Sequence, residues 1–323
     1  MKVVVLYNTR PEVIQEQIEA EYDSEFTIQS IQKALSVKHE VVLIGVDKDF
    51  KWIKKILDLN ADIVLNVCEG YRGPARESVF AAILEQLSIP YAGPDSTNLL
   101  ICQNKTLSKL LLNDVCDFPH GYLISDLPIA SDYWKGNYPM IVKLNSEGSS
   151  IGLSEASIVY TREELLSQVD FLLRTYNQSV IAEEFIEGKD YSIAYIEGLG
   201  ILGPCIVEND ATFYDYNSKT IYDSEVTISP IHGDFSELKK IAQKIVTKLD
   251  LRGYGKLDFR YRNGVYYLIE VNGQVSLHPK GEFIVCAERD GFSFEQIVNH
   301  IVSYAYRKKQ DIIFSAGVGD CYV

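Results

Sequence analysis

Along the first 95 residues, short apolar runs alternate with segments whose apolar side chains recur at helical spacing. The apolar runs are typical of buried strands and comprise residues 2–7, 40–46 and 61–67, with a shorter one at 88–93. The helical segments are residues 24–35, 50–58 and 75–87. Strands that alternate with helices in this way predict a doubly wound parallel sheet, with a ligand crevice at the carboxyl ends of its strands.

Beyond residue 95 the pattern changes to longer stretches of strand separated by single helices. The expected helices are residues 103–113, 161–174, 235–249 and 293–308. The expected strands are residues 138–143, 149–159 and 179–186, with antiparallel β structure at 190–208 and 255–272. Residues 309–323 are expected to form an irregular tail without an assigned function. This part of the chain therefore has α+β character.

The strongest chemical signal is a pair of apolar runs, residues 255–259 and 268–272, on either side of the hairpin turn signal Asn263-Gly264. If one strand carries an extra bulge residue, Asp258 lies opposite Glu270, and Asn272 projects from the same face. The opposite face then joins the core through Leu257, Phe259, Ile269 and Val271.

Three oxygen-bearing side chains on one face of a hairpin suit Mg²⁺ or Mn²⁺. The alternative is a solvated hairpin face that happens to be acidic. The strands are otherwise strongly apolar, and two carboxylates on one apolar hairpin repel each other unless a cation neutralises them. The pattern therefore favours a metal site.

A lysine and a glycine-containing loop supply the second signal. Lys143 ends an apolar strand, and residues 147–152 (EGSSIG) follow it. Glycines let a backbone approach phosphates, and successive N–H groups form an anion-binding nest. Such a loop alone is more often an ordinary hairpin connection, but the nearby lysine and the acidic hairpin favour a phosphate site.

A third signal is the apolar strand at residues 180–187, which leads into carboxylates and then into Gly188-Lys189-Asp190. Such a strand can offer backbone groups to adenine and acidic side chains to ribose hydroxyls. Surface acids at a strand end are the alternative, and the strand by itself favours them.

Charge and composition exclude several classes of function. The net charge is −14, whereas a surface that binds a nucleic-acid duplex needs the opposite sign. No run of about 18 apolar residues predicts a membrane span, and the N-terminus lacks a signal-peptide pattern, so we expect a cytoplasmic protein. The six cysteines are far apart and form no CxxC pair, so buried free thiols are expected instead of zinc or disulfides.

In this order and at these separations, the blocks resemble the ATP-grasp superfamily and, within it, the D-alanine–D-alanine ligases. The resemblance spans residues 1–305 and is carried by IPYAGPD (89–95), QNKTLSK (103–109), VKLNSEGSSIG (142–152), AEEFIEGKDYSI (182–193), DYNSK (215–219) and the acidic hairpin. It implies an α/β substrate domain at 1–95, and two α+β subdomains at 96–180 and 181–308 that clamp ATP.

The resemblance also implies a role for individual residues. The ATP phosphates would be held by Lys105, Lys143, Lys219 of a mobile loop, Glu147, Ser149 and Ser150. The adenine and ribose would lie near Glu183, Glu184, Ile186 and Asp190. The metal ligands would be Asp258, Glu270 and Asn272, and the catalytic residues Lys256, Lys219 and Ser150. Glu25 would hold the ammonium group of the first substrate.

The reaction that the resemblance implies has two steps. A substrate carboxylate attacks the γ-phosphorus of ATP and gives an acyl-phosphate and ADP. An amine then attacks the acyl carbon, and phosphate leaves. The protein contributes mainly positioning and neutralisation of charge.

The chain departs from the family at the substrate positions. The family's Leu-His-Gly is Cys68-Glu69-Gly70 here, the tyrosine after the mobile-loop lysine is Thr220, and an expected arginine is Lys256. The segment that usually binds the acceptor carboxylate is replaced by GQVSLHPKG (273–281). The candidate substrate-binding residues are Glu69, Arg76, His278 and Lys280. Surface salt bridges for Arg76 and Lys280, and a plain loop position for His278, are the alternatives.

These departures favour a ligase that joins two amino acids, or an amino acid and a peptide or amine, outside cell-wall dipeptide synthesis. The first alternative is a D-alanine–D-alanine ligase with a divergent pocket. The second is a nucleotide-binding regulatory protein that has lost turnover. We expect small-molecule amino-acid or peptide substrates and no nucleic-acid or membrane partner. The resemblance also implies a homodimer, as the family often forms.

Overall fold

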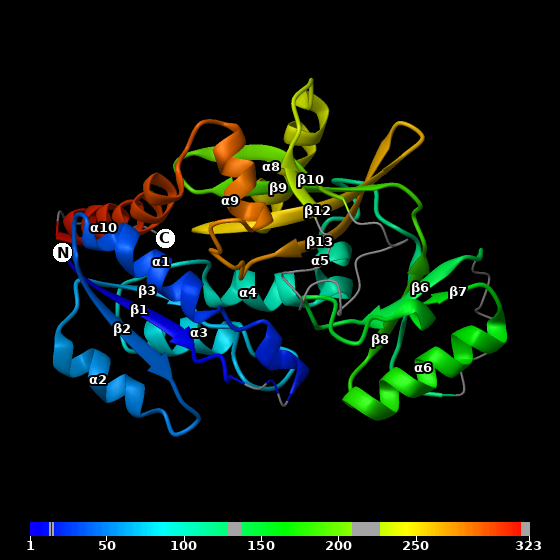
Figure 1. The fold of residues 1–323 in the computed structure, drawn as a ribbon, viewed down its shortest axis with the longest axis horizontal. Coiled ribbons are helices and arrows are strands. Elements are labelled where there is room, and N and C mark those ends of the chain that lie inside the picture. The colour runs from blue at the N-terminus through cyan, green and yellow to red at the C-terminus, as the bar shows by residue number, and fades with distance from the viewer. Residues whose placement is uncertain (13, 15, 128–136, 209–226, 318–323) are drawn as a thin grey trace.

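A computed structural model describes residues 1–323 except 13, 15, 128–136, 209–226 and 318–323, and for 310–317 it describes the backbone only. The chain forms three sheets, each with its own covering helices (Figure 1). The expected combination of an α/β domain with an α+β region is confirmed. None of the helices within the described residues combines the length and apolar character that a bilayer span requires.

The first sheet is parallel, with the strand order β2-β1-β3-β4. Its strands are β1 (Lys2–Asn8), β2 (Glu40–Val46), β3 (Ile63–Val67) and β4 (Tyr91–Ala92). Its helices are α1 (Glu25–Ser36), α2 (Lys51–Leu59) and α3 (Ser78–Gln86). Val3 and Val5 pack in one core with α1, whereas Val4 and Leu6 pack with α2 and α3 in another. Because successive side chains of β1 enter opposite cores, both faces of the sheet are buried, as a doubly wound sheet requires.

The second sheet is antiparallel, with the order β11-β10-β9-β12-β13. Its strands are β9 (Lys189–Ile196), β10 (Gly200–Glu208), β11 (Thr227–Pro230), β12 (Tyr254–Arg262) and β13 (Val265–Asn272). Helix α8 (Ser236–Leu249) covers one face, through a core that includes Leu257 and Phe259. Helix α9 (Glu282–Arg289) lies on the other face, where Phe283 and Ile284 join the core of the first domain.

The third sheet is also antiparallel, with the order β5-β8-β6-β7, and carries helix α6 (Arg162–Tyr176). Its strands are β5 (Gly121–Ile124), β6 (Met140–Leu144), β7 (Ile158–Val159) and β8 (Val180–Glu184). Figure 1 shows this sheet at one end of the molecule, facing the second sheet across the loops that follow β6 and β8. The two antiparallel sheets therefore form the lobes between which the sequence motifs converge.

Four secondary-structure predictions need correction. The helix expected at 103–113 is α5 (Lys105–Leu111), which begins after Asn104 because the Asn104 side chain accepts a hydrogen bond from Leu107 N; the helix before it, α4 (Ser96–Gln103), was not predicted. The strand expected at 149–159 is limited to β7, since residues 149–152 form turns and Glu155–Ser157 form a short 3-10 helix. Helix α9 was not predicted.

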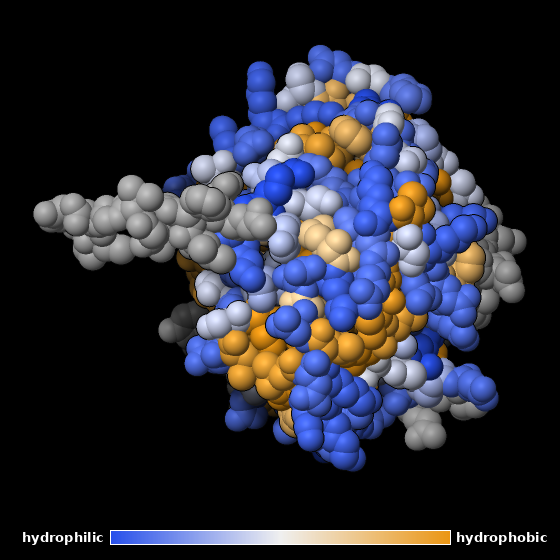
Figure 2. Space-filling model, turned by 90° about the vertical axis from the view of Figure 1, so that its left-hand side faces the viewer, coloured by the Kyte–Doolittle hydropathy of each residue, from blue (hydrophilic) through white to orange (hydrophobic). Residues whose placement is uncertain are grey.

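The irregular tail expected at 309–323 is the fourth wrong prediction, because helix α10 (Phe294–Gly317) extends into it. Its first half packs against α1, with Ile297, Val298 and Ile301 in the core of the first domain. Figure 2 shows this end of the molecule, where hydrophilic side chains surround a patch of hydrophobic ones. The C-terminal helix thereby joins the last part of the chain to the first. The domain boundaries and the homodimer stay predictions.

Candidate active site

The acidic hairpin has the register that the sequence predicts. Asp258 pairs with Glu270, and the ladder shifts by one residue between Asp258 and Phe259. The predicted core face is wrong at one position, because Phe259 pairs with Leu268 and Leu268 is buried in the core. Ile269 is the bulge residue and lines a cavity instead. The bulge thus turns Ile269 and Glu270 toward the lobe formed by the third sheet.

The hairpin carboxylates are partly buried, with about a fifth of each side chain exposed, and they lie beside a lysine. Asp258 accepts hydrogen bonds from Ser192 at 2.6 Å and from the Asn272 amide at 2.8 Å, and Lys256 Nζ lies 3.0 Å from it. Burial raises the pKa of Asp258, and Glu270 adds to the rise while Lys256 opposes it. A divalent cation would relieve this cost, so the donor set of two carboxylates and an amide oxygen fits Mg²⁺. Among the described residues, no three His, Cys, Asp or Glu side chains are arranged to hold a metal ion, so a site at Asp258 and Glu270 would also use the amide oxygen of Asn272.

The glycine loop after β6 is held in place by cations from two other segments. Lys105 Nζ donates to the Glu147 carbonyl oxygen and lies 3.3 Å from Glu270. Ser149 and Ser150 both have positive φ, of 46° and 58°. They lie in a turn that is closed by a 3.0 Å hydrogen bond from Ile151 N to the Gly148 carbonyl oxygen. Successive N–H groups in a turn can form an anion nest, so the loop is compatible with phosphate binding.

Lys143 forms a buried ion pair, although the sequence assigned it to phosphate. Glu183 is 1% exposed, lies 3.1 Å from Lys143 and also pairs with Lys109. Burial alone would raise the pKa of Glu183, but the two lysines outweigh it and lower that pKa. Two ammonium groups share one carboxylate, so this cluster keeps a net positive charge for an anion nearby.

Two acids that were expected near adenine and ribose have arginine partners. Asp190 receives two hydrogen bonds from Arg260, at 2.6 and 3.0 Å, and Arg260 also donates to the Ile186 carbonyl oxygen at 2.9 Å. Glu184 pairs with Arg262 at 2.7 Å. The structure thus places Asp190 beside the cavity, but its carboxylate is already engaged by a guanidinium group.

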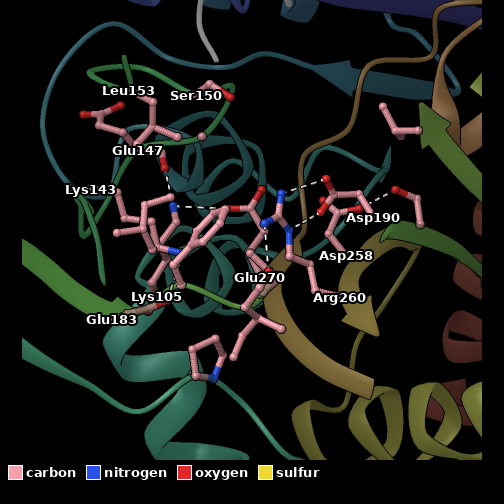
Figure 3. A pocket seen from close by; sticks show the side chains of 18 of the residues that line it. Lys105, Lys143, Glu147, Ser150, Leu153, Glu183, Asp190, Asp258, Arg260 and Glu270 are labelled. Carbon is pink, nitrogen blue, oxygen red and sulfur yellow. Dashed lines mark hydrogen bonds and ion pairs between the residues drawn. The ribbon is translucent and has the colours of Figure 1, made fainter. Parts of the chain in front are cut away.

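These groups surround one cavity of about 140 Å³ between the two lobes. Figure 3 shows the loop residues Glu147, Ser150 and Leu153 along one side, the lysines along another, and Asp190, Asp258 and Arg260 facing them. The predicted residues that line it are Lys105, Lys143, Glu147, Ser150, Glu183, Glu184, Ile186, Asp190, Lys256, Asp258 and Glu270. The cavity is smaller than the ~300 Å³ at which ligand pockets begin.

A second cavity of about 730 Å³ adjoins the first and extends toward the parallel sheet. Gly148, Lys256, Glu270 and Glu282 line both cavities. The predicted residues that line the second are Glu69, Ser149, Lys256, Glu270, Asn272, His278 and Lys280. Asp23 and Ser276 also line this cavity, and the Ser276 hydroxyl donates a 2.5 Å hydrogen bond to Asp23.

Two predicted substrate residues lie outside the lining of both cavities. Glu25 is exposed and accepts a hydrogen bond from Gln29 at 2.7 Å. Arg76 is 2% exposed and lies between Glu21 at 2.5 Å and Glu147 at 2.7 Å. Its salt bridges are buried, not at the surface as the alternative had it. Arg76 therefore fastens the glycine loop to the first domain. Lys219 and Thr220 lie outside the described residues.

The remaining substrate candidates are less constrained. The His278 ring lies 5.6 Å from the Phe26 ring, and its Nδ1 accepts a hydrogen bond from Lys280 N at 3.1 Å. Burial lowers the pKa of His278, and Lys280 lowers it further. His278 is therefore neutral near pH 7, as a general base must be.

Several residues at the site were not predicted: Asp23, Glu77, Lys109, Ser192, Arg260 and Glu282. Strand alternation could have found Arg260, which is two residues from Asp258 on the same strand and so shares its face. Lys109 and Ser192 belong to pairs separated by 74 and 66 residues, and no local pattern reveals such pairs.

Comparisons with known proteins agree with this geometry. Residues 130–303, more than half of the chain, match the family model described as D-ala D-ala ligase C-terminus. The D-alanine–D-alanine ligase of Thermotoga petrophila is 29% identical over 286 residues, which cover 86% of this chain and 91% of the relative. That of Maridesulfovibrio salexigens is 28% identical over 291 residues, which cover 86% and 92%.

Solved structures show the same fold. A Bacillus anthracis D-alanine–D-alanine ligase matches with a TM-score of 0.80 and 22% identity over 97% of this chain and 99% of that one. The same enzyme complexed with ATP gives a TM-score of 0.77 at 21% identity, again over 97% and 99%. The VanG D-Ala:D-Ser ligase of Enterococcus faecalis gives 0.71 at 18% identity, over 94% and 99%. The predicted ATP-grasp fold, the ligase class and the ATP and Mg²⁺ cofactors are confirmed. The chain belongs to the D-alanine–D-alanine ligase family.

Proposed function

We propose that this ligase joins the carboxylate of an amino acid to the amine of a second small molecule, in a reaction other than cell-wall dipeptide synthesis. The observation that carries the proposal is the contrast between its two cavities. The cavity of about 140 Å³ between the two lobes, called the nucleotide cavity below, is lined by most of the residues that the family resemblance implies for ATP and Mg²⁺. The second cavity is lined by Glu69, His278 and Lys280, which belong to segments where the chain departs from the family. Glu282, the residue directly after one of these segments, lines both cavities.

In the first step, a carboxylate oxygen of the substrate attacks the γ-phosphorus, and the bond from phosphorus to the bridging oxygen of ADP breaks. Lys105 and Lys143 would neutralise charge on the phosphates, and the nest at Ser149 and Ser150 would hold the transferred group. Mg²⁺, held by Asp258, Glu270 and Asn272, would supply further positive charge at the phosphate oxygens.

In the second step, the amine nitrogen attacks the acyl carbon, the C–O bond to phosphate breaks, and the nitrogen loses a proton. Lys256 lines both cavities, so its ammonium group is placed to stabilise the oxyanion of the tetrahedral intermediate. Asp258 and Glu282, at 3.0 and 3.5 Å, raise the pKa of Lys256 well above its usual range even though burial opposes them. Lys256 therefore stays charged throughout the reaction.

A substrate panel tests the proposal. Pairs of amino acids and amines are incubated with ATP and Mg²⁺, ADP release is followed, and products are identified by mass. A pair other than D-alanine with D-alanine should give the highest ADP release. If D-alanine alone gives the dipeptide at the highest rate, the chain is a cell-wall ligase. ATP binding without ADP release on any pair would favour the regulatory alternative.

The variant Glu270→Ala provides the control for the metal site. It should lose ADP release by ~10²-fold or more while keeping the native circular dichroism spectrum, because a metal ligand is removed from a folded hairpin. Asp58→Asn, on the exposed side of α2, is the matched control and should keep full activity. Full activity in Glu270→Ala would refute the metal role. The cytoplasmic location, the homodimer and the role of Lys219 are further predictions.

A further inference from the structure

The second cavity carries an excess of negative charge. Of the side chains that line it, seven are carboxylic acids and three are lysine or arginine. Three of the acids are compensated by the protein: Glu21 by Arg76 at 2.5 Å, Glu270 by Lys105 at 3.3 Å, and Glu282 by Lys256 at 3.5 Å. The excess therefore lies with the acids that remain.

Three of those remaining acids converge from different segments of the first domain. Asp23 precedes α1, Glu69 follows β3, and Glu77 precedes α3, so all three lie at the carboxyl end of the parallel sheet. Asp23 accepts a hydrogen bond from Ser276, and Glu77 is 4.0 Å from Arg76. Among the described residues, Glu69 has no ion pair within 4.0 Å. This crevice is where a doubly wound sheet binds its ligand.

The pKa values of these three acids are raised, because burial outweighs the positive charge that the protein places near them. Burial raises the pKa of Glu77 to about 8 and that of Asp23 to about 6. Burial and the neighbouring Glu77 and Glu21 raise the pKa of Glu69 well above its usual range. Buried carboxylates in this condition are stabilised by any cation that enters the cavity.

An independent observation comes from the opposite wall. Gln274 lines the cavity and is 7% exposed, and among the described residues neither its Oε1 nor its Nε2 has a hydrogen-bond partner. A buried carbonyl oxygen without a donor costs free energy unless a ligand supplies the donor. An ammonium group is all donor and no acceptor, so it matches both Gln274 Oε1 and the three acids.

We propose that the second cavity binds an amine substrate that carries a second positive charge, which Asp23, Glu69, Glu77 and the Gln274 carbonyl oxygen hold away from the reacting nitrogen. The nitrogen that attacks an acyl carbon has to be unprotonated, so recognition by charge needs another cationic group on the same molecule. The assignment of the reacting end rests on the proposed function, because that end has to reach Lys256 and Glu270, where the cavities meet.

Two sources supply this chemistry, namely simple diamines and basic amino acids. Arg10 and Lys280 also line the cavity and offer cations to a carboxylate. A basic amino acid can use both ends of the cavity, whereas a diamine uses the acidic end alone. Comparison of the two sources shows whether the basic residues contribute.

Isothermal titration calorimetry tests the proposal on the full chain, saturated with Mg²⁺ and a non-hydrolysable ATP analogue. Each arm compares a dication with its isostere of lower charge: 1,5-diaminopentane with pentylamine, and lysine with norleucine. The more cationic member should bind roughly tenfold tighter or more in at least one arm, since each hydrogen bond to a charged group contributes about that factor. Glu69→Gln and Glu77→Gln should each reduce the preference, while Asp58→Asn keeps it.

Equal binding of the paired ligands in both arms, or a preference that survives both Glu69→Gln and Glu77→Gln, would overturn the proposal. Both substitutions replace a carboxylic acid by an amide of similar size, and thermal melting shows that each variant is folded. ADP release is measured with the same ligands. Dication binding without ADP release contradicts the ligase proposal and leaves this inference standing. Ligation that is faster with the members of lower charge contradicts this inference and leaves the ligase proposal standing.

Discussion

The two cavities share a wall and differ in where their compensating charge comes from. In the nucleotide cavity the acids have partners within the protein: the buried Glu183 has two lysines, and the partly exposed Asp190 has Arg260. In the second cavity Glu69 and Glu77 have no partner closer than Arg76 at 4.0 Å among the described residues. The two cavities therefore differ in how the protein compensates the charge of their acids.

This comparison separates a site that holds its own geometry from one that depends on its ligand. Ion pairs fix the lysines of the nucleotide cavity before ATP arrives, so little has to be ordered on binding. In the second cavity the carboxylates are either protonated or charged without a cation beside them until a cationic ligand enters. Selectivity for the substrate can then come from charge, because a neutral molecule leaves those acids uncompensated.

The largest effect is expected at Arg76, which joins the two regions. Arg76→Met leaves Glu21, Glu77 and Glu147 facing one another without a cation. Because breaking a buried ion pair leaves a buried charge, the free energy of unfolding should fall by about 4 kcal/mol in urea denaturation. Arg76→Lys should lose less, since it keeps the charge but not the two-pronged contact. An unchanged midpoint in Arg76→Met would contradict the assigned role.

A smaller loss is expected within the nucleotide region. Lys109→Met removes one of the two partners of Glu183, and Lys143 remains at 3.1 Å. The free energy of unfolding should fall by about 3 kcal/mol, again in urea denaturation. Addition of Glu183→Gln to Lys109→Met should recover part of the loss, because no buried anion is then left. A double variant that is less stable than the single one would show that packing, not charge, sets the effect.

The acidic cavity should show itself in the pH dependence of stability. Because Glu77 has a pKa of about 8 when folded and about 4.5 when unfolded, the folded state holds a proton that the unfolded state has lost across this interval. Stability should therefore fall as pH rises from 4.5 to about 8, with the apparent melting temperature dropping by a few degrees. The charged groups that face Glu77 are Arg76, Glu21, Lys105 and Glu147.

Glu77→Gln should flatten this pH profile of the ligand-free protein, measured by thermal melting at a series of pH values. Asp23 contributes in the same direction over a lower interval, between 3.8 and about 6. If the variant and the parent chain lose stability in parallel across the interval, Glu77 is not the group responsible.

The smallest effect is expected at an exposed ion pair, which calibrates the others. Arg174 is 79% exposed and contacts Asp170 at 2.8 Å, one helical turn away in α6. Arg174→Ala should change the free energy of unfolding by less than about 0.5 kcal/mol. A loss as large as that of Lys109→Met would remove burial as the explanation of the difference between the regions.

The sequence predicted the fold well where a pattern is local and periodic. Apolar runs located the strands of the parallel sheet, and the turn at Asn263-Gly264 located the hairpin and its bulged register. Prediction failed where a single side chain decides. Asn104 separates α4 from α5 by capping the second helix. A hydrophobic pattern read over many residues does not detect the effect of one capping side chain.

For the site, the sequence predicted which residues gather but not how they pair. Lys105, Lys143, Asp258 and Glu270 line the nucleotide cavity as expected. Arg76, expected at substrate, instead bridges Glu21 and Glu147, which are 55 and 71 positions away from it. Such pairs form only when separate elements meet.

By itself, the sequence determined most of the order of strands and helices and the acidic hairpin, because these depend on side-chain periodicity and on residue types at fixed separations. The ATP-grasp character followed from the resemblance of its motifs to a known family. Only the tertiary structure decided which acids are neutralised by the protein and which await a ligand. The physical reason is that burial sets the free energy of a charge, and burial depends on every segment that closes around it.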